Sequence, residues 1–272
     1  MPEVDPRDII GEVLGVPPDG ELLRESGGFQ CPFTQSRCTK RSQRSKQPFP
    51  VCSVYRTARS IENLVAVCPK RLLASNFAFD IVEHCWSGAM PAKVEVVHEV
   101  KMADVGTVDA VVAEMSEDRN SVLNFVSVEL QAVDITGSYS SAYDALASGT
   151  PLEKRPVYGF NWANVKKRYI TQLVSKGFYH QQWQTRIASV LQDHVFNYFT
   201  EKLRFDEISP SRADIVFLVY KYAAAPNGHY NLSLDRVVGT SHSSLMMQAL
   251  YSQTPPKSDF CRRIVEKLQS GS

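Results

Sequence analysis

The sequence lacks several features that would place the protein in a specialised class. Its 272 residues contain no apolar run of the roughly 20 residues that a membrane-spanning helix needs. The first residues, MPEVDPRDII, are acidic and do not show the basic-then-apolar order of a secretory signal peptide. Internal repeats and low-complexity tracts are also missing. These absences predict a cytoplasmic globular protein with no membrane partner.

A strong overall charge is also missing, because the formal net charge at pH 7 is only +1. The total therefore does not indicate a nucleic-acid partner, and any such signal must be local. One stretch, residues 27–71, is basic: Glu62 alone opposes Arg37, Lys40, Arg41, Arg44, Lys46, Arg56, Arg59, Lys70 and Arg71. Such a stretch fits contacts with phosphates, although a solvated surface has the same composition.

The six cysteines, at positions 31, 38, 52, 68, 85 and 261, include no Cys-x-x-Cys pair. Disulfides are not expected in a reducing compartment, so these thiols are either buried or bound to a metal ion. Cys31, Cys38, Cys52 and Cys68 fall in the basic stretch, which has too little apolar material for a core of its own. A structural four-thiolate site for Zn²⁺ or iron would staple it, and four buried thiols are the alternative.

The hydrophobic pattern divides the chain near residue 72. Residues 1–71 are predicted to contain a short helix at 6–14 and then the cysteine-containing segment. Residues 72–272 show the alternation and turns of a regular α/β domain. Its predicted strands are 93–102, 108–115, 122–132, 213–223 and 230–238. Its predicted helices are 72–86, 164–203, 243–251 and 259–268, and residues 136–156 are predicted to be a loop.

Three polar side chains interrupt the apolar strands near their ends. Asp109 begins the second predicted strand, and Glu129 and Gln131 lie two residues apart in SVELQAVD, so they share one face of the third. If these strands are neighbours, the three side chains converge. Two adjacent carboxylates repel each other unless a cation lies between them, and Mg²⁺ prefers such oxygen ligands.

A magnesium ion at this place would polarise a phosphodiester and lower the pKa of a bound water, which is the chemistry of hydrolysis. Gln131 cannot act as a base, but its amide could orient the water. From the spacing alone a different interpretation is open. Asp109 could cap a turn, and Glu129 could pair with a nearby arginine or lysine.

The order of an acid, a spacer and Glu-x-Gln resembles the PD-(D/E)xK nucleases in which glutamine replaces the final lysine. More narrowly, GTVDAVV (106–112), ELQAVDITGSY (129–139) and NWANVKKRYITQLVSKG (161–177) resemble the NotI family of type II restriction endonucleases. Members of that family carry a small module in which four cysteines hold an iron ion, and the four cysteines lie where that module would be. The likeness fades in the C-terminal third, and no proline precedes Asp109.

The resemblance implies a PD-(D/E)xK core of α+β type, a mixed sheet flanked by helices, at 72–272, with a four-cysteine metal module in residues 1–71. It implies Asp109 and Glu129 as Mg²⁺ ligands, Gln131 in the lysine position and Glu99 as an auxiliary acidic residue. Iron rather than zinc at the cysteines rests on the resemblance alone.

The function that follows is Mg²⁺-dependent hydrolysis of double-stranded DNA at a palindrome, GC-rich by analogy, leaving 5′-phosphate and 3′-hydroxyl ends. A homodimer and a methyltransferase encoded nearby are expected with it. Expected DNA contacts are Arg56, Arg59, Lys166, Lys167 and Arg168. The alternatives are a structure-specific repair nuclease and a non-cleaving DNA-binding protein with a four-cysteine metal module.

Overall fold

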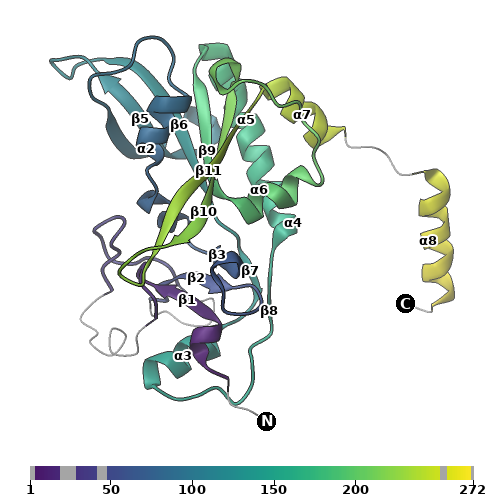
Figure 1. Cartoon of the computed structure of the whole chain (residues 1–272). Coiled ribbons are helices and arrows are strands. Elements are labelled where there is room, and N and C mark those ends of the chain that lie inside the picture. The colour runs from purple at the N-terminus through teal and green to yellow at the C-terminus, as the bar shows by residue number, and fades with distance from the viewer. Residues whose placement is uncertain (1–3, 19–28, 42–47, 252–255, 271–272) are drawn as a thin grey trace.

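The computed structural model describes residues 4–18, 29–41, 48–251 and 256–270, and a mixed six-stranded sheet lies at its centre (Figure 1). Its strands are β4 (Glu95–Lys101), β5 (Thr107–Met115), β6 (Val122–Gln131), β9 (Arg186–Gln192), β10 (Ile215–Ala224) and β11 (Tyr230–Thr240). Their order across the sheet is β11-β10-β9-β6-β5-β4. The β6–β9 and β9–β10 pairs are parallel, and the other neighbours are antiparallel.

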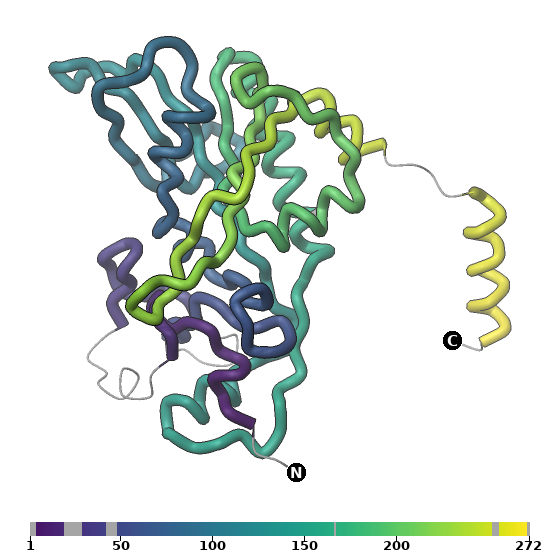
Figure 2. Tube along the Cα trace, in the orientation of Figure 1, coloured from purple at the N-terminus to yellow at the C-terminus, as the bar shows by residue number. Residues whose placement is uncertain are grey.

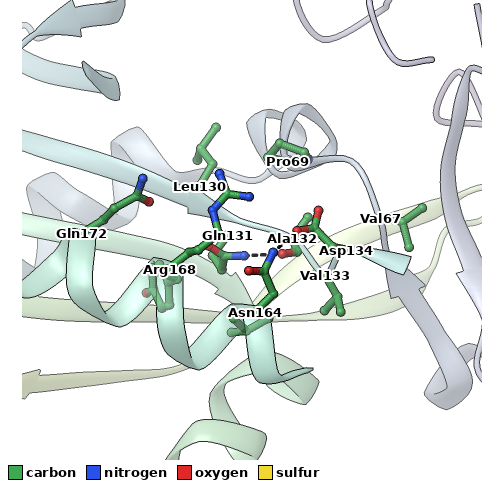
Figure 3. A pocket seen from close by; sticks show the side chains of 12 residues that line it. Val67, Pro69, Leu130, Gln131, Ala132, Val133, Asp134, Asn164, Arg168 and Gln172 are labelled. Atoms are coloured by element: carbon green, nitrogen blue, oxygen red, sulfur yellow. Dashed lines mark hydrogen bonds between the residues drawn. The ribbon is translucent and has the colours of Figure 1, made fainter. Parts of the chain in front are cut away.

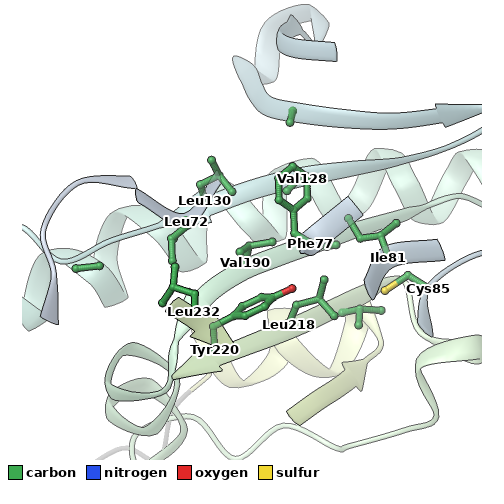
Figure 4. Close-up of a cluster of buried hydrophobic side chains, with 14 of the residues drawn as sticks. Leu72, Phe77, Ile81, Cys85, Val128, Leu130, Val190, Leu218, Tyr220 and Leu232 are labelled. Carbon is green, nitrogen blue, oxygen red and sulfur yellow. The ribbon is translucent and has the colours of Figure 1, made fainter. Parts of the chain in front are cut away.

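Helices cover both faces of this sheet. On one face, α2 (Phe77–His84) packs Phe77 and Ile81 against apolar side chains of β6, β9 and β10 (Figure 4). On the other face, α5 (Thr171–Trp183), α6 (Asp193–Thr200) and α7 (His242–Leu250) contribute to a second apolar cluster. The middle strands β9 and β10 are accordingly buried along most of their length, as expected of strands that are covered on both sides.

A smaller sheet is built from the N-terminal part of the chain. It has the order β1-β2-β3, with β1 at Ile10–Val13, β2 at Val51–Tyr55 and β3 at Leu64–Ala66. Its apolar cluster is completed by α3 (Ser140–Ser148), which supplies Ala142, Ala145 and Leu146. Figure 2 shows this later segment running beside the start of the chain. The described residues before position 72 therefore share an apolar cluster with residues that follow the Glu-x-Gln strand.

The remaining elements connect these parts. The short strands β7 (Ile135–Gly137) and β8 (Tyr158–Phe160) pair with each other, and α4 (Trp162–Asn164) leads into a π-helix at Val165–Ile170 and then α5. The C-terminal α8 (Lys257–Gln269) buries none of its residues. Among the described residues, no helix combines the length and the apolar character that crossing a bilayer would require.

Most of the expected elements are confirmed. The meander of three strands is present as β4, β5 and β6, and the hairpin at 213–238 is present as β10 and β11. The two C-terminal helices are present as α7 and α8, and the expected helix at 72–86 is present in its second half as α2. The mixed sheet with helices on both faces confirms the α+β class. The division of the chain at residue 72 stays a prediction.

Three expectations were wrong. The helix predicted at 6–14 is a single 3-10 turn, Pro6–Asp8, followed by the strand β1. The loop predicted at 136–156 contains β7 and α3. The long helix predicted at 164–203 is interrupted by β9, whose buried run of apolar residues has the same composition as a buried helix.

Burial in the sheet predicts that two leucines contribute very differently to the free energy of unfolding. Leu218 in β10 is fully buried, whereas Leu123 in β6 is 62% exposed. Leu218→Ala is expected to lower the free energy of unfolding by about 2–5 kcal/mol, because it removes buried methyl groups and leaves a cavity. Urea denaturation would measure the change, with Leu123→Ala as the control, which should shift the midpoint little. Equal effects of the two substitutions would contradict this assignment of the core.

Candidate active site

The antiparallel pairing of β5 and β6 brings Asp109 and Glu129 together. Ala110 pairs with Val128, so Asp109 lies opposite Glu129 one step further along the two strands. The side chains of Ala110 and Val128 belong to the cluster under α2, so Asp109 and Glu129 point to the other face, toward α5. The two carboxylates are close enough for the charge of Asp109 to raise the pKa of Glu129. The convergence expected from the sequence is therefore present for these two residues.

Each of the two carboxylates is held by one oxygen. Oδ2 of Asp109 accepts a hydrogen bond from the backbone N–H of Leu130 at 2.8 Å. Oε1 of Glu129 accepts from Nζ of Lys176 at 2.5 Å, and this lysine also donates to the carbonyl of Thr107 at 2.7 Å. The side chains of Lys176 and Glu129 are only 3% and 9% exposed. Glu129 thus pairs with a lysine, as in the alternative interpretation of the sequence.

Helix α5 brings Lys176 to this position. Leu173, Lys176, Gly177 and His180 form its buried face, as the spacing of three and four residues requires. Gly177 lets the helix approach the sheet closely, because a Cβ atom there would lie 2.9 Å from Cδ1 of Ile215. A lysine on the buried face of the helix therefore reaches the sheet instead of water.

Burial dominates the electrostatics of both acids. It raises the pKa of Glu129 to about 7, although the hydrogen bond and charge of Lys176 act in the opposite direction and Asp109 raises it further. Burial also raises the pKa of Asp109, against the lowering effects of the Leu130 N–H and of Lys176. Holding both groups ionised at neutral pH is therefore costly without a further cation.

The remaining oxygens of the two acids suit a divalent ion. Within the described part of the chain, Oδ1 of Asp109 and Oε2 of Glu129 have no hydrogen-bond or ion-pair partner. Facing carboxylates with one unpaired oxygen each are the donors that Mg²⁺ selects. The residues present therefore fit a magnesium ion.

Gln131 lies on the same face of β6 as Glu129, two residues further along the strand. Its Nε2 donates to the carbonyl of Ala132, and its side chain lines a pocket of about 170 Å³ (Figure 3). Asn164, Arg168 and Gln172 line the same pocket, which lies between the end of β6 and the π-helix. Nδ2 of Asn164 donates to Asp134 at 2.7 Å. The backbone N–H of Asn161 also donates to the carbonyl of Asp134, so Asp134 fixes the start of α4 beside the end of β6.

Glu99 lies near Asp109 but is exposed. The β4–β5 register is unchanged from the His98–Ala110 pair to the Val100–Val108 pair, so Glu99 lies opposite Asp109, with a left-handed backbone φ of 56°. Its charge raises the pKa of Asp109. In the described ranges, Asp80, Glu83 and His84 form the only group of three His, Cys, Asp or Glu residues whose ligand atoms all lie within 4.8 Å of one another. Glu99 therefore does not complete a three-ligand set with Asp109 and Glu129.

The basic residues expected to contact DNA lie on two segments. Arg56 and Arg59 are exposed after β2, and Lys167 and Arg168 are exposed on the π-helix. The side chain of Lys166 lies outside the described residues. Arg168 is the one of these that lines the pocket beside Gln131.

The four cysteines come together as two pairs. Cys31 and Cys38 stand at the ends of a turn that the Gln30–Arg37 bridge closes. Cys52 in β2 and Cys68, which follows β3, lie on adjacent chain segments. Burial raises the pKa of the Cys38 thiol, and it raises the pKa of Cys52 to about 12. Charge at Cys68 adds to both increases. All six cysteines of the chain are described, and none forms a disulfide.

Lys40 ties the segments that carry these thiols. Its Nζ donates to the carbonyls of Val51 and Val67, the residues that precede Cys52 and Cys68, and to the hydroxyl of Tyr139. The four sulfurs supply the donors that zinc or iron takes, but no three of them lie within 4.8 Å of one another. The chemistry of the donor set fits a thiophilic ion.

Comparison with known families decides what this arrangement belongs to. The family model described as restriction endonuclease NotI matches residues 22–232, which include the paired acids, Gln131, Lys176 and the four cysteines. The chain belongs to the NotI restriction endonuclease family. No curated protein matches the sequence. Membership in the NotI family implies sequence-specific cleavage of DNA, hence a nuclease that binds double-stranded DNA.

The sequence interpretation missed Lys176 in this NotI-family chain. The signal was present, because a lysine at position 176 shares a helix face with Leu173 and Gly177, where a solvated residue is not expected. Glu129 in its apolar strand needed such a cation. The missing information was the closeness of α5 to β6, which depends on β9 being a strand.

The raised pKa of Glu129 predicts how stability depends on pH when no divalent metal is added. Folded Glu129 keeps its proton up to pH of about 7, whereas unfolded glutamate loses it near the ordinary value of 4.5. The folded state therefore binds more protons than the unfolded state in this window. As the pH rises from 4.5 to 7, the contribution of Glu129 to the free energy of unfolding falls by at most about 3 kcal/mol. Urea denaturation at several pH values would show a flatter dependence for Glu129→Gln. Identical pH profiles for the two proteins would contradict the prediction.

Proposed function

We propose that this NotI-family member is a type II restriction endonuclease that hydrolyses double-stranded DNA at a palindrome in the presence of Mg²⁺, leaving 5′-phosphate and 3′-hydroxyl ends. The observation that carries the proposal is the pair of facing acids, Asp109 and Glu129, each with one oxygen anchored by the protein and one left over. Bound at these oxygens, the ion would activate water and neutralise charge on the scissile phosphate.

The residues around the acids have separate tasks in this proposal. Leu130 N–H and Lys176 orient the two carboxylates. Gln131 is neutral, so it would orient water or a phosphate oxygen through its amide after turning from Ala132. Glu99, exposed on β4 opposite Asp109, is an auxiliary acid.

A route for the DNA strand would run from Gln131 toward Lys40 and Arg41. The pocket beside Gln131 shares Val67, Val133 and Asp134 with a larger pocket of about 610 Å³, which is also lined by Lys40 and Arg41. We assign Arg168 and Lys167, with Lys166, to phosphate contacts near the cleaved bond, and Arg56 and Arg59 to contacts further along the duplex. Such contacts position the duplex but do not read its sequence.

The module of residues 1–71 is proposed to hold iron or zinc at the four cysteines as a structural ion. A two-fold homodimer would match a palindromic site, with each protomer cutting one strand. A methyltransferase encoded nearby would protect the host DNA in the cytoplasm.

Substitution of the acids tests the proposal. Asp109→Ala and Glu129→Ala are each expected to slow cleavage by at least about 10³-fold, because they remove a metal ligand. The matched control is Glu95→Ala. The carboxylate of Glu95 accepts a hydrogen bond from Arg119 at 2.5 Å and is not part of the proposed site. Discrete bands on a digest of DNA with many sites, lost in both variants and kept in the control, are the expected result.

Other outcomes of the same digest separate the rival functions. Unchanged cutting by both alanine variants refutes the assignment of the site. A mobility shift without any cutting by the native protein favours a DNA-binding protein, and cutting only at junctions or lesions favours a repair nuclease. Sequencing the ends of the fragments identifies the recognition site.

Metal analysis tests the cysteine module. Elemental analysis of the purified native protein is expected to find about one iron or zinc per chain. Replacement of any one of Cys31, Cys38, Cys52 and Cys68 by serine should lower this content and the melting temperature. Cys261→Ser is the control, because Cys261 is exposed on α8. A native protein free of both metals under anaerobic purification would contradict the proposal.

A further inference from the structure

The cleavage site has a positive charge that its motif does not supply. In the order of acid, spacer and Glu-x-Lys, the cation follows the glutamate by two residues on the same strand. Here that position is Gln131, which is neutral and whose amide donates to the carbonyl of Ala132. Lys176 instead brings an ammonium group to Glu129 from helix α5, at 2.5 Å.

The contacts of Lys176 are those of a group fixed in place. It is held between a carboxylate of β6 and the carbonyl of Thr107 in β5, two residues before Asp109. Its side chain is 3% exposed, so both contacts are screened from water. It therefore connects the two strands that carry the acids, on the face where those acids project.

The orientation of Glu129 depends on this contact. Oε1 is engaged by Lys176, and within the described part of the chain Oε2 has no partner. A glutamate has three side-chain torsions, so an anchor on one oxygen determines where the other points. The backbone N–H of Leu130 does the same for Asp109.

The charge balance gives the lysine a second effect. Two carboxylates and one ammonium leave one negative charge at the site, and a divalent ion converts this to one positive charge. That charge is equal and opposite to the charge of one phosphodiester. Without Lys176 the site with its ion would be neutral, and it would lose attraction for the scissile phosphate.

We propose that Lys176 is a positioning residue of the cleavage site: from helix α5 it takes the place of the motif lysine, aligning Glu129 and supplying the site's positive charge. This inference rests on the proposed nuclease function. A purely structural ion pair between α5 and the sheet would serve folding but would leave the reaction of the folded enzyme unchanged.

The test compares cleavage by folded variants that lack this charge. Lys176→Met removes the charge, and Lys176→Gln removes it but keeps a hydrogen-bond donor, so it is the second choice if the methionine variant does not fold. Single-turnover cleavage at saturating Mg²⁺, below the melting temperature of every variant, is expected to slow by about 10²-fold. The KM for DNA should change much less than kcat. Lys221→Met, which breaks an exposed pair with Asp235, is the matched control.

Relocation of the charge distinguishes the proposed role from a structural one. Gln131→Lys, added to the Lys176→Met or Lys176→Gln variant, places a lysine at the motif position and is expected to recover cleavage by at least about tenfold. Recovery without a matching rise in melting temperature supports the proposal. Native cleavage rates in a folded variant without charge at 176, or no recovery on relocation, overturn it.

Failure of this inference and failure of the nuclease function give different results. If the native protein cleaves and Glu129→Ala does not, but the Lys176 variants cleave normally, only the role of Lys176 is wrong. If the native protein does not cleave DNA, the proposed function fails and the role of Lys176 falls with it.

Discussion

One buried ion pair, between Lys176 and Glu129, connects the central sheet to the helix that covers it. Both side chains are almost fully removed from water, so each needs the other: breaking such a pair by removing one partner typically costs about 3–5 kcal/mol. The additional bond from Lys176 to Thr107 links the neighbouring strand. The orientation of the Glu129 carboxylate between the sheet and α5 therefore depends on a single ammonium group.

The meander and the need of Glu129 for a partner could be predicted, because the hydrophobic pattern of short sequence segments determines both. The alternation in residues 93–102 and 108–115, together with polar turns, predicted the meander, and the meander alone places Asp109 opposite Glu129. The side chain of Glu129 in an apolar strand also signalled an obligatory partner. In both cases the physical constraint acts between neighbours in sequence or between adjacent strands.

Other parts depended on contacts between distant segments. Residues 186–192 are buried on both faces because α2 covers one side of the sheet and α5 and α6 cover the other, and nothing in their own pattern separates a strand from a buried helix turn. A helix predicted through residues 186–192 gives the segment 171–183 no defined buried face, so that prediction does not identify Lys176. The N-terminal strand β1 was missed for a similar reason, since its burial comes from β2 and from α3, far along the chain.

The position of α3 has a consequence for protein engineering. The segment between β6 and α4 leaves the nuclease sheet, contributes Tyr139, Ala142 and Leu146 to the N-terminal apolar cluster, and returns to begin the helix that carries Lys176. Hydrophobic contacts thus bind the cysteine-bearing end of the chain to an excursion from the nuclease core. A chimera that exchanges residues 1–71 between two relatives would have to exchange residues 135–160 as well. Otherwise the exchanged segment would lose the apolar side chains against which it packs.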